Sequence, residues 1–195
     1  MAQGKVFIIG AGPGDWELIS LKGLKRLKEA DVVLYDFLAS RELLGFAKKN
    51  AEIICVGKKD GLRLLEQARI NKLLYQKAKA GRAVARLKGG DPFVFSRGIE
   101  EALYLEKKGI DFEIIPGITS AFGVPESFGI PLTRRGKFSS VAVLTGRKSK
   151  KEDIEEIPAV WVDVDFKTCN QADVDKLMSS FKLKPSIVVE SGNGY

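Results

Sequence analysis

Acidic and basic residues follow two apolar, strand-like runs of the sequence. Asp36 comes directly after residues 31–35 (DVVLY), and Lys58 comes shortly after residues 52–56 (EIICV). In open parallel sheets, ligands bind beyond the carboxyl ends of the strands. An acid and a base at neighbouring strand ends can form either a proton-handling pair or a plain surface ion pair, and spacing alone leaves both open. Because the chain has no histidine, proton transfer must fall to carboxylate, lysine, tyrosine or water.

Three further turns have the composition of ligand-binding loops. Residues 10–15 (GAGPGD) and 88–92 (KGGDP) are rich in glycine, which lets backbone approach a ligand closely. The dinucleotide spacing G-x-G-x-x-G is not met, so a plain tight turn remains an alternative for the first. The Asp91 carboxylate could accept hydrogen bonds from a ligand or simply open a turn before proline. Residues 116–121 (PGITSA) place small polar side chains where a helix begins, which simple N-capping also explains.

Elements with strand and helix patterns alternate through the first half of the chain. This rhythm predicts an α/β fold with a mostly parallel sheet covered on both faces. Pro116-Gly117 is the best candidate boundary, so we expect two α/β domains, 1–115 and 116–195, the second being short at its C-terminus. The expected strands are 5–9, 31–35, 52–56, 83–87, 112–115, 140–144, 159–164 and 186–190, and the expected helices are 21–30, 66–80, 97–108, 118–128 and 173–181.

The composition is that of a soluble globular protein. Hydrophobic residues make up 45% and charged residues 29% of 195 residues, and no apolar run is long enough to cross a membrane. The formal charge of +7 suits a polyanionic ligand or solvated helix faces, but the basic residues are not interleaved with aromatics as in a nucleic-acid groove. Two distant cysteines define no disulfide framework, the usual zinc ligand is absent, and no signal peptide stands out. We therefore expect a cytoplasmic protein without a metal site.

Several long motifs, in this order, resemble the tetrapyrrole methylase family and within it the branch that acts on uroporphyrinogen III. The matching stretches are residues 10–40, 86–102 and 116–136, with shorter matches at 57–61 and 67–71. The resemblance implies a homodimer of two-domain subunits that bind S-adenosylmethionine in the cleft between the domains. The implied reaction methylates two pyrrole carbons of this anionic tetrapyrrole, giving precorrin-2 and S-adenosylhomocysteine, on the route to sirohaem and cobalamin.

The resemblance also implies roles for individual residues. Asp36 would be the proton acceptor and Lys58 the proton donor, which favours the proton-handling pair. Arg97 and Arg134 lie in matched motifs and are either ligands for the substrate carboxylates or ordinary surface arginines. The implied cofactor contacts are Pro13, Gly89, Gly90, Asp91, Val94, Thr119, Ser120, Val164 and Gly192.

The chain departs from the family pattern where the family usually has histidines. Arg134 and Arg147 occupy two of these places, and Leu62 or Leu64 the third. Two alternatives stay open beside the main interpretation. One is a methylase of a later precorrin, and the other is a protein that binds S-adenosylmethionine or a tetrapyrrole without turnover.

Overall fold

The computed structural model describes residues 3–57, 66–135, 141, 143–145 and 161–163. The helix expected at 173–181 and the strand expected at 186–190 lie outside these residues. Contacts between Cα atoms divide the chain into two compact units, Met1–Val124 and Pro125–Tyr195. The first unit contains the main sheet and most of the expected site residues.

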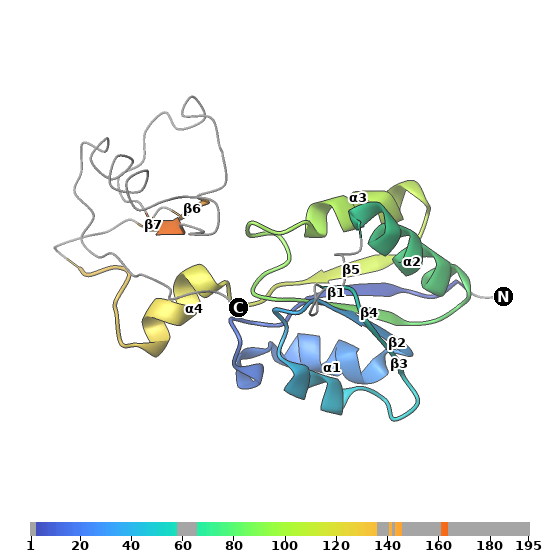
Figure 1. Cartoon of the computed structure of the whole chain (residues 1–195), viewed down its shortest axis with the longest axis horizontal. Helices are drawn as coiled ribbons and strands as arrows, with labels where there is room; N and C mark the ends of the chain where they lie inside the picture. Colours follow the sequence, from blue (N-terminus) through green and yellow to red (C-terminus); the bar gives the residue numbers. More distant parts are fainter. Residues whose placement is uncertain (1–2, 58–65, 136–140, 142, 146–160, 164–195) are drawn as a thin grey trace. The chain divides into compact units, whose positions relative to one another are not determined.

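Five parallel strands form that sheet, in the order β3-β2-β4-β1-β5 (Figure 1). Every neighbouring pair is parallel, so all five carboxyl ends lie along the same edge. This arrangement confirms the predicted parallel α/β architecture. The strands are β1 (Val6–Gly10), β2 (Val32–Tyr35), β3 (Glu52–Cys55), β4 (Val84–Lys88) and β5 (Phe112–Ile115).

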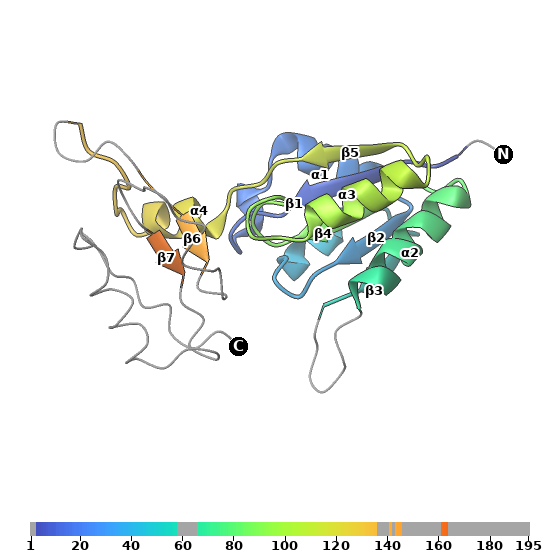
Figure 2. The same ribbon diagram turned by 90° about the horizontal axis from the view of Figure 1, so that it is seen from above.

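Helices cover both faces of the sheet, with α2 and α3 on one side and α1 on the other (Figures 1 and 2). The side chain of Ser20 accepts a hydrogen bond from Gly23 N at 3.1 Å, which caps α1 at its first turn. Two short 3-10 helices were not predicted from the sequence. The helices are α1 (Leu21–Glu29), α2 (Gln67–Lys79) and α3 (Gly98–Lys107), and the 3-10 helices are η1 (Trp16–Leu18) and η2 (Arg41–Phe46).

The alternation of side chains along the strands divides the core into two layers. Val6 and Ile8 of β1 pack in the layer that also holds buried residues of α2 and α3. Phe7 and Ile9 point the other way, into the layer with buried residues of α1 and η2. Because each fully buried large aliphatic side chain contributes roughly 1.5–3 kcal/mol, this two-sided burial fixes the sheet as a rigid platform.

Shorter elements follow β5. Helix α4 (Ser120–Ser127) begins in the first unit and ends in the second, where β6 (Val143–Thr145) and β7 (Trp161–Asp163) form a parallel pair. No helix within the described ranges is long and apolar enough to cross a membrane.

Two carboxylates near the amino ends of the strands form ion pairs. Asp31 accepts hydrogen bonds from Lys48 Nζ at 2.6 Å and from Ala83 N at 2.9 Å, and these contacts lower the pKa of Asp31. The pKa of Glu52 is likewise lowered by its hydrogen bond with Lys77. Both groups therefore stay charged in the folded protein to lower pH than in the unfolded chain.

We expect the free energy of unfolding to decrease as the pH falls through the acidic range. The unfolded carboxyl groups take up protons first, at about pH 4, so the contribution of these pairs is complete above that pH and is lost as the pH drops through the lower folded-state pKa values. Urea unfolding at pH 7 and at pH 3 measures the loss. Asp31→Asn should lose less stability than wild type between the two pH values, and an equal loss would contradict the assignment to Asp31.

Candidate active site

Four glycines bring the carboxyl ends of β1, β4 and β5 into direct backbone contact. Gly12 and Gly90 exchange backbone hydrogen bonds of 3.2 and 2.7 Å, which ties the turn after β1 to the turn after β4. A β-carbon on Gly117, after β5, would lie 2.3 Å from the carbonyl oxygen of Gly90 and 2.7 Å from Cα of Gly10. No side chain fits there, so these turns can meet only because the positions are glycine.

Asp91 joins two of these turns through its carboxylate. Oδ1 accepts from the backbone N–H of Phe93 at 2.8 Å, and Oδ2 accepts from that of Gly117 at 3.0 Å. The first contact is the local turn expected of an aspartate in this position, and the second holds the turn after β5. Each oxygen keeps a further lone pair, so a role in accepting from a ligand remains a prediction.

The predicted cofactor contacts of the first unit gather around Gly90. That residue has φ +64°, in the left-handed region that favours glycine, and a β-carbon there would lie 3.8 Å from Ser120 N and from Thr119 Cα. Pro13 packs against α4, since a β-carbon on Gly123 would lie 2.8 Å from Pro13 Cγ. These turns therefore form one patch of backbone and small side chains at the edge of the sheet.

The other two predicted contacts lie on either side of Gly90 in the sequence. Gly89 lies under Leu38, because a β-carbon there would be 2.6 Å from Leu38 Cβ. Val94 is exposed between two exposed phenylalanines, Phe93 and Phe95. Phe95 has φ +47°, and no other non-glycine residue of the described part has a positive φ. Such strain costs about 1–2 kcal/mol and often marks functional loops.

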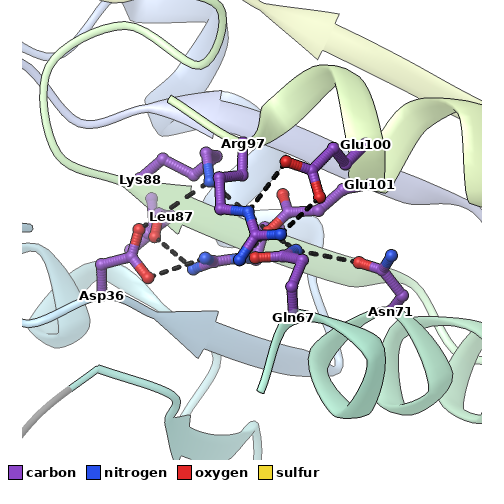
Figure 3. A network of polar contacts seen from close by, with 9 residues as sticks. Asp36, Gln67, Asn71, Leu87, Lys88, Arg97, Glu100 and Glu101 are labelled. Carbon is purple, nitrogen blue, oxygen red and sulfur yellow. Dashed lines mark hydrogen bonds and ion pairs between the residues drawn. The ribbon is translucent and has the colours of Figure 1, made fainter. Parts of the chain in front are cut away.

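Asp36 lies at the carboxyl end of β2, at the end of a chain of buried charges (Figure 3). Its side chain is 27% exposed, and Oδ1 accepts from Arg86 Nη2 at 2.7 Å. Lys88 Nζ lies 4.0 Å from Oδ2. Behind them, Glu101 Oε1 accepts from Arg86 Nε at 3.0 Å, from Lys88 Nζ at 3.4 Å and from Gln67 Nε2 at 3.1 Å. The predicted acid is thus linked through β4 to α2 and α3.

The two cations in this network have opposite pKa shifts. Burial of Arg86 opposes its charge, but the carboxylates of Glu101 and Asp36 outweigh that cost, and its pKa is raised. Burial of Lys88, together with the nearby Arg86 cation, lowers the pKa of Lys88 despite the same carboxylates. Arg86 is therefore the permanent charge beside Asp36, and Lys88 gives up its proton more easily than an ordinary lysine.

The structure does not place the remaining predicted site residues in the glycine patch or beside Asp36. Arg97 is exposed and forms a two-point ion pair with Glu100, with distances of 2.8 and 2.7 Å (Figure 3). Arg134 is exposed and belongs to the second unit. Lys58, Val164 and Gly192 lie outside the described residues. No three aspartate, glutamate, cysteine or histidine side chains gather as possible metal ligands in the part of the chain that the structure covers.

Sequence reasoning missed Arg86, Lys88 and Glu101, which are at most 4% exposed. A signal for them was present. β4 (VARLK) carries two cations although it is an inner strand of the sheet. The first turn of α3 contains two adjacent glutamates, Glu100 and Glu101, and one of them must face the sheet. Buried charges require partners, so these residues predict one another.

Comparison of the sequence with known protein families shows which family contains this chain. The sequence profile of the tetrapyrrole (corrin/porphyrin) methylases matches residues 5–168. The chain belongs to the tetrapyrrole methylase family. The match covers all five strands of the main sheet and both glycine-rich turns, which confirms the resemblance noted from the motifs.

Within this family, the chain is similar to several uroporphyrinogen-III C-methyltransferases. The chain is 56% identical over 161 residues to a uroporphyrinogen-III C-methyltransferase of Methanocaldococcus jannaschii, covering 80% of this chain and 66% of that protein. A crystal structure of uroporphyrin-III C-methyltransferase from Thermus thermophilus has 42% identity and a TM-score of 0.69, covering 83% of this chain and 68% of that one. A second Thermus thermophilus structure, complexed with S-adenosylhomocysteine, has 45% identity and a TM-score of 0.62, covering 73% and 59%. The chain thus spans 59–68% of the length of these relatives.

Proposed function

We propose that this tetrapyrrole methylase transfers methyl groups from S-adenosylmethionine to two pyrrole carbons of uroporphyrinogen III, forming precorrin-2 and S-adenosylhomocysteine. The observation that carries the proposal is the 56% identity over 161 residues with a uroporphyrinogen-III C-methyltransferase. The family match over residues 5–168 includes Asp36 and the glycine-rich turns, which are the features that the chemistry needs from the protein.

The turns at the carboxyl edge of the sheet fit a nucleoside ligand. Around Gly90 the patch consists of backbone and small side chains, and its left-handed backbone leaves room where other residues would place a β-carbon. Thr119 and Ser120 add polar groups beside it, and Pro13 follows Gly12, which is hydrogen-bonded to Gly90. A relative with 45% identity has been crystallised with S-adenosylhomocysteine, which supports the same cofactor class here. We expect Gly89, Asp91 and Val94 to complete this contact set, together with Val164 and Gly192.

Asp36 is the residue that we assign to proton removal. Bound S-adenosylmethionine supplies an activated methyl group, so the protein's main task is to align a pyrrole carbon and handle charge. Positive charge develops on the tetrapyrrole ring as the methyl group is transferred, and a ring proton must then depart. A partly exposed carboxylate held by Arg86 can stabilise that charge and accept the proton. Lys58 is the proposed proton donor.

The charge of the chain suits an anionic tetrapyrrole. Uroporphyrinogen bears eight carboxylates, and the chain has a formal net charge of +7. Arg97 and Arg134 are exposed and carry guanidinium groups that can bind carboxylates at two points. We propose both as substrate ligands, within a homodimer.

An anaerobic incubation with methyl-deuterated S-adenosylmethionine and uroporphyrinogen III, analysed by mass spectrometry, tests the function. We expect a product that carries two labelled methyl groups, and omission of the cofactor serves as the control. If no methyl group is transferred, titration with S-adenosylhomocysteine on the same sample separates the alternatives. Binding without transfer would favour a later precorrin as substrate or a non-catalytic binding role, and absence of binding would contradict the assigned cofactor site.

A further inference from the structure

We infer that Arg86, braced by Glu101, is a positioning residue that orients the Asp36 carboxylate toward the substrate. The inference rests on the proposed function, in which Asp36 accepts the ring proton. Arg86 lies inside the core and is 2% exposed, so it acts through Asp36 and not by touching the substrate.

The guanidinium of Arg86 is held at all three of its nitrogen atoms. Nη2 donates to Asp36 Oδ1 at 2.7 Å, Nε donates to Glu101 Oε1 at 3.0 Å, and Nη1 donates to the carbonyl oxygen of Leu87 at 3.0 Å. The acceptors come from the end of β2, from α3 and from the backbone of β4. Because a guanidinium is planar and rigid, three fixed acceptors leave it a single orientation.

Glu101 is the brace that holds this orientation from behind. It is fully buried, and its Oε1 also accepts from Lys88 and from Gln67, which in turn donates to Asn71 at 2.9 Å (Figure 3). The brace is therefore fixed by β4 and by α2 as well as by its own helix. Movement of the Arg86 guanidinium would break several hydrogen bonds among buried side chains, where each is costly to lose.

Asp36 has little else that fixes the direction of its side chain. Its backbone N–H donates to Leu87 O at 3.1 Å, which positions the main chain. Lys88 is the other charged group that faces it within the described residues, and its Nζ lies 4.0 Å from Oδ2, beyond hydrogen-bond distance. Arg86 thus supplies the short directional contact to a carboxylate whose other oxygen is left available.

Stability alone gives no reason for a charge network in this place. A buried ion pair can often be replaced by apolar side chains without loss of stability, because desolvation offsets the attraction. The same protein has Arg82 paired with Glu52 at 2.6 Å near the amino ends of the strands, where both side chains remain about one third exposed. Arg86, in contrast, is buried near the carboxyl ends of the strands, where the site lies. One of its nitrogen atoms, Nη2, donates a hydrogen bond to the predicted base Asp36.

A kinetic double-mutant cycle on the full chain tests this role. Arg86→Lys keeps a buried cation beside Glu101 but lacks the fork that reaches three acceptors. We expect its kcat to fall about 100-fold, since misplacement of a reacting group by about 1 Å has that effect, while its KM and its affinity for S-adenosylhomocysteine stay near wild-type values. In the Asp36→Asn background the same Arg86→Lys substitution should cause no further loss of kcat. Arg82→Lys is the matched control and should leave kcat unchanged.

Several outcomes would overturn the inference, and they differ from those that would overturn the function. Wild-type kcat in Arg86→Lys would do so, and so would an equal fractional loss in the wild-type and Asp36→Asn backgrounds. If Arg86→Lys fails to fold, the pair Arg86→Gln/Glu101→Gln removes both buried charges together, and it should bind S-adenosylhomocysteine yet lose kcat in the same non-additive way. A wild-type protein that transfers no methyl group would remove the proposed function and this role with it.

Discussion

Asp36→Asn should lower the rate of methyl transfer by about 10²–10⁴-fold, the range typical for removal of a general base. Asparagine has nearly the same shape and keeps an oxygen that can accept from Arg86 Nη2, so the local structure should persist. What disappears is the negative charge and the ability to take a proton. We therefore expect binding of S-adenosylhomocysteine, measured by calorimetric titration, to remain near the wild-type value.

The matched control for this substitution is Asp111→Asn. The carboxylate of Asp111 pairs with Lys5 Nζ at 3.0 Å and is 71% exposed. Asp111 directly precedes β5, so it lies near the amino ends of the strands, opposite the carboxyl ends where Asp36 lies. The control removes one carboxylate charge without touching the Asp36 network and should keep wild-type rates. Wild-type turnover in Asp36→Asn would remove this residue from the mechanism, and loss of cofactor binding would mean that its role is structural.

Gly117→Ala should abolish cofactor binding and destabilise the fold. A β-carbon at this position would lie 2.3 Å from the carbonyl oxygen of Gly90 and 2.7 Å from Cα of Gly10, far inside contact distance. Because all of these neighbours are backbone atoms, the turns after β1, β4 and β5 must separate. We expect a loss of about 1–3 kcal/mol in the free energy of unfolding, as for other overpacked sites. Urea unfolding and titration with S-adenosylhomocysteine measure the two effects.

Gly45→Ala is the control for this prediction. Gly45 lies in η2, and a β-carbon there would meet no atom within 4 Å. The same added methyl group should therefore leave both stability and cofactor affinity near wild type. If Gly117→Ala binds the cofactor like this control, the three turns do not form the cofactor site that we propose.

The fold was predictable because the parallel sheet leaves a strong sequence pattern. Continuous apolar runs such as Val6–Gly10 read as buried strands, and the helices between them carry caps and glycine stops close to the observed ends. η1 and η2 were missed because short 3-10 helices have no hydrophobic period long enough to recognise. Their residues read as loops, although Leu43 of η2 is part of the core.

The site was predictable only in part, since composition reveals turns but not pairings. Asp36, Gly90 and Asp91 stood out as two acids and a glycine that follow strands. The buried partners of Asp36 did not, because Arg86 lies 50 residues from Asp36 in the sequence and Glu101 lies a further 15 residues along the chain. Likewise, the need for glycine at Gly117 follows from contact with Gly90 and Gly10, which only the strand order brings about.

The strand order also has a consequence for biosynthesis. In the sheet β1 lies between β4 and β5, so Val6 pairs with Val84 and with Phe112. The ribosome makes β1 before β4 and β5, and these two partners emerge after a delay on the order of seconds at usual elongation rates. The nascent apolar strand must remain unpaired during that time, which favours slow folding and contact with chaperones. The first glycine-rich turn thus receives its backbone partners among the last contacts of this unit.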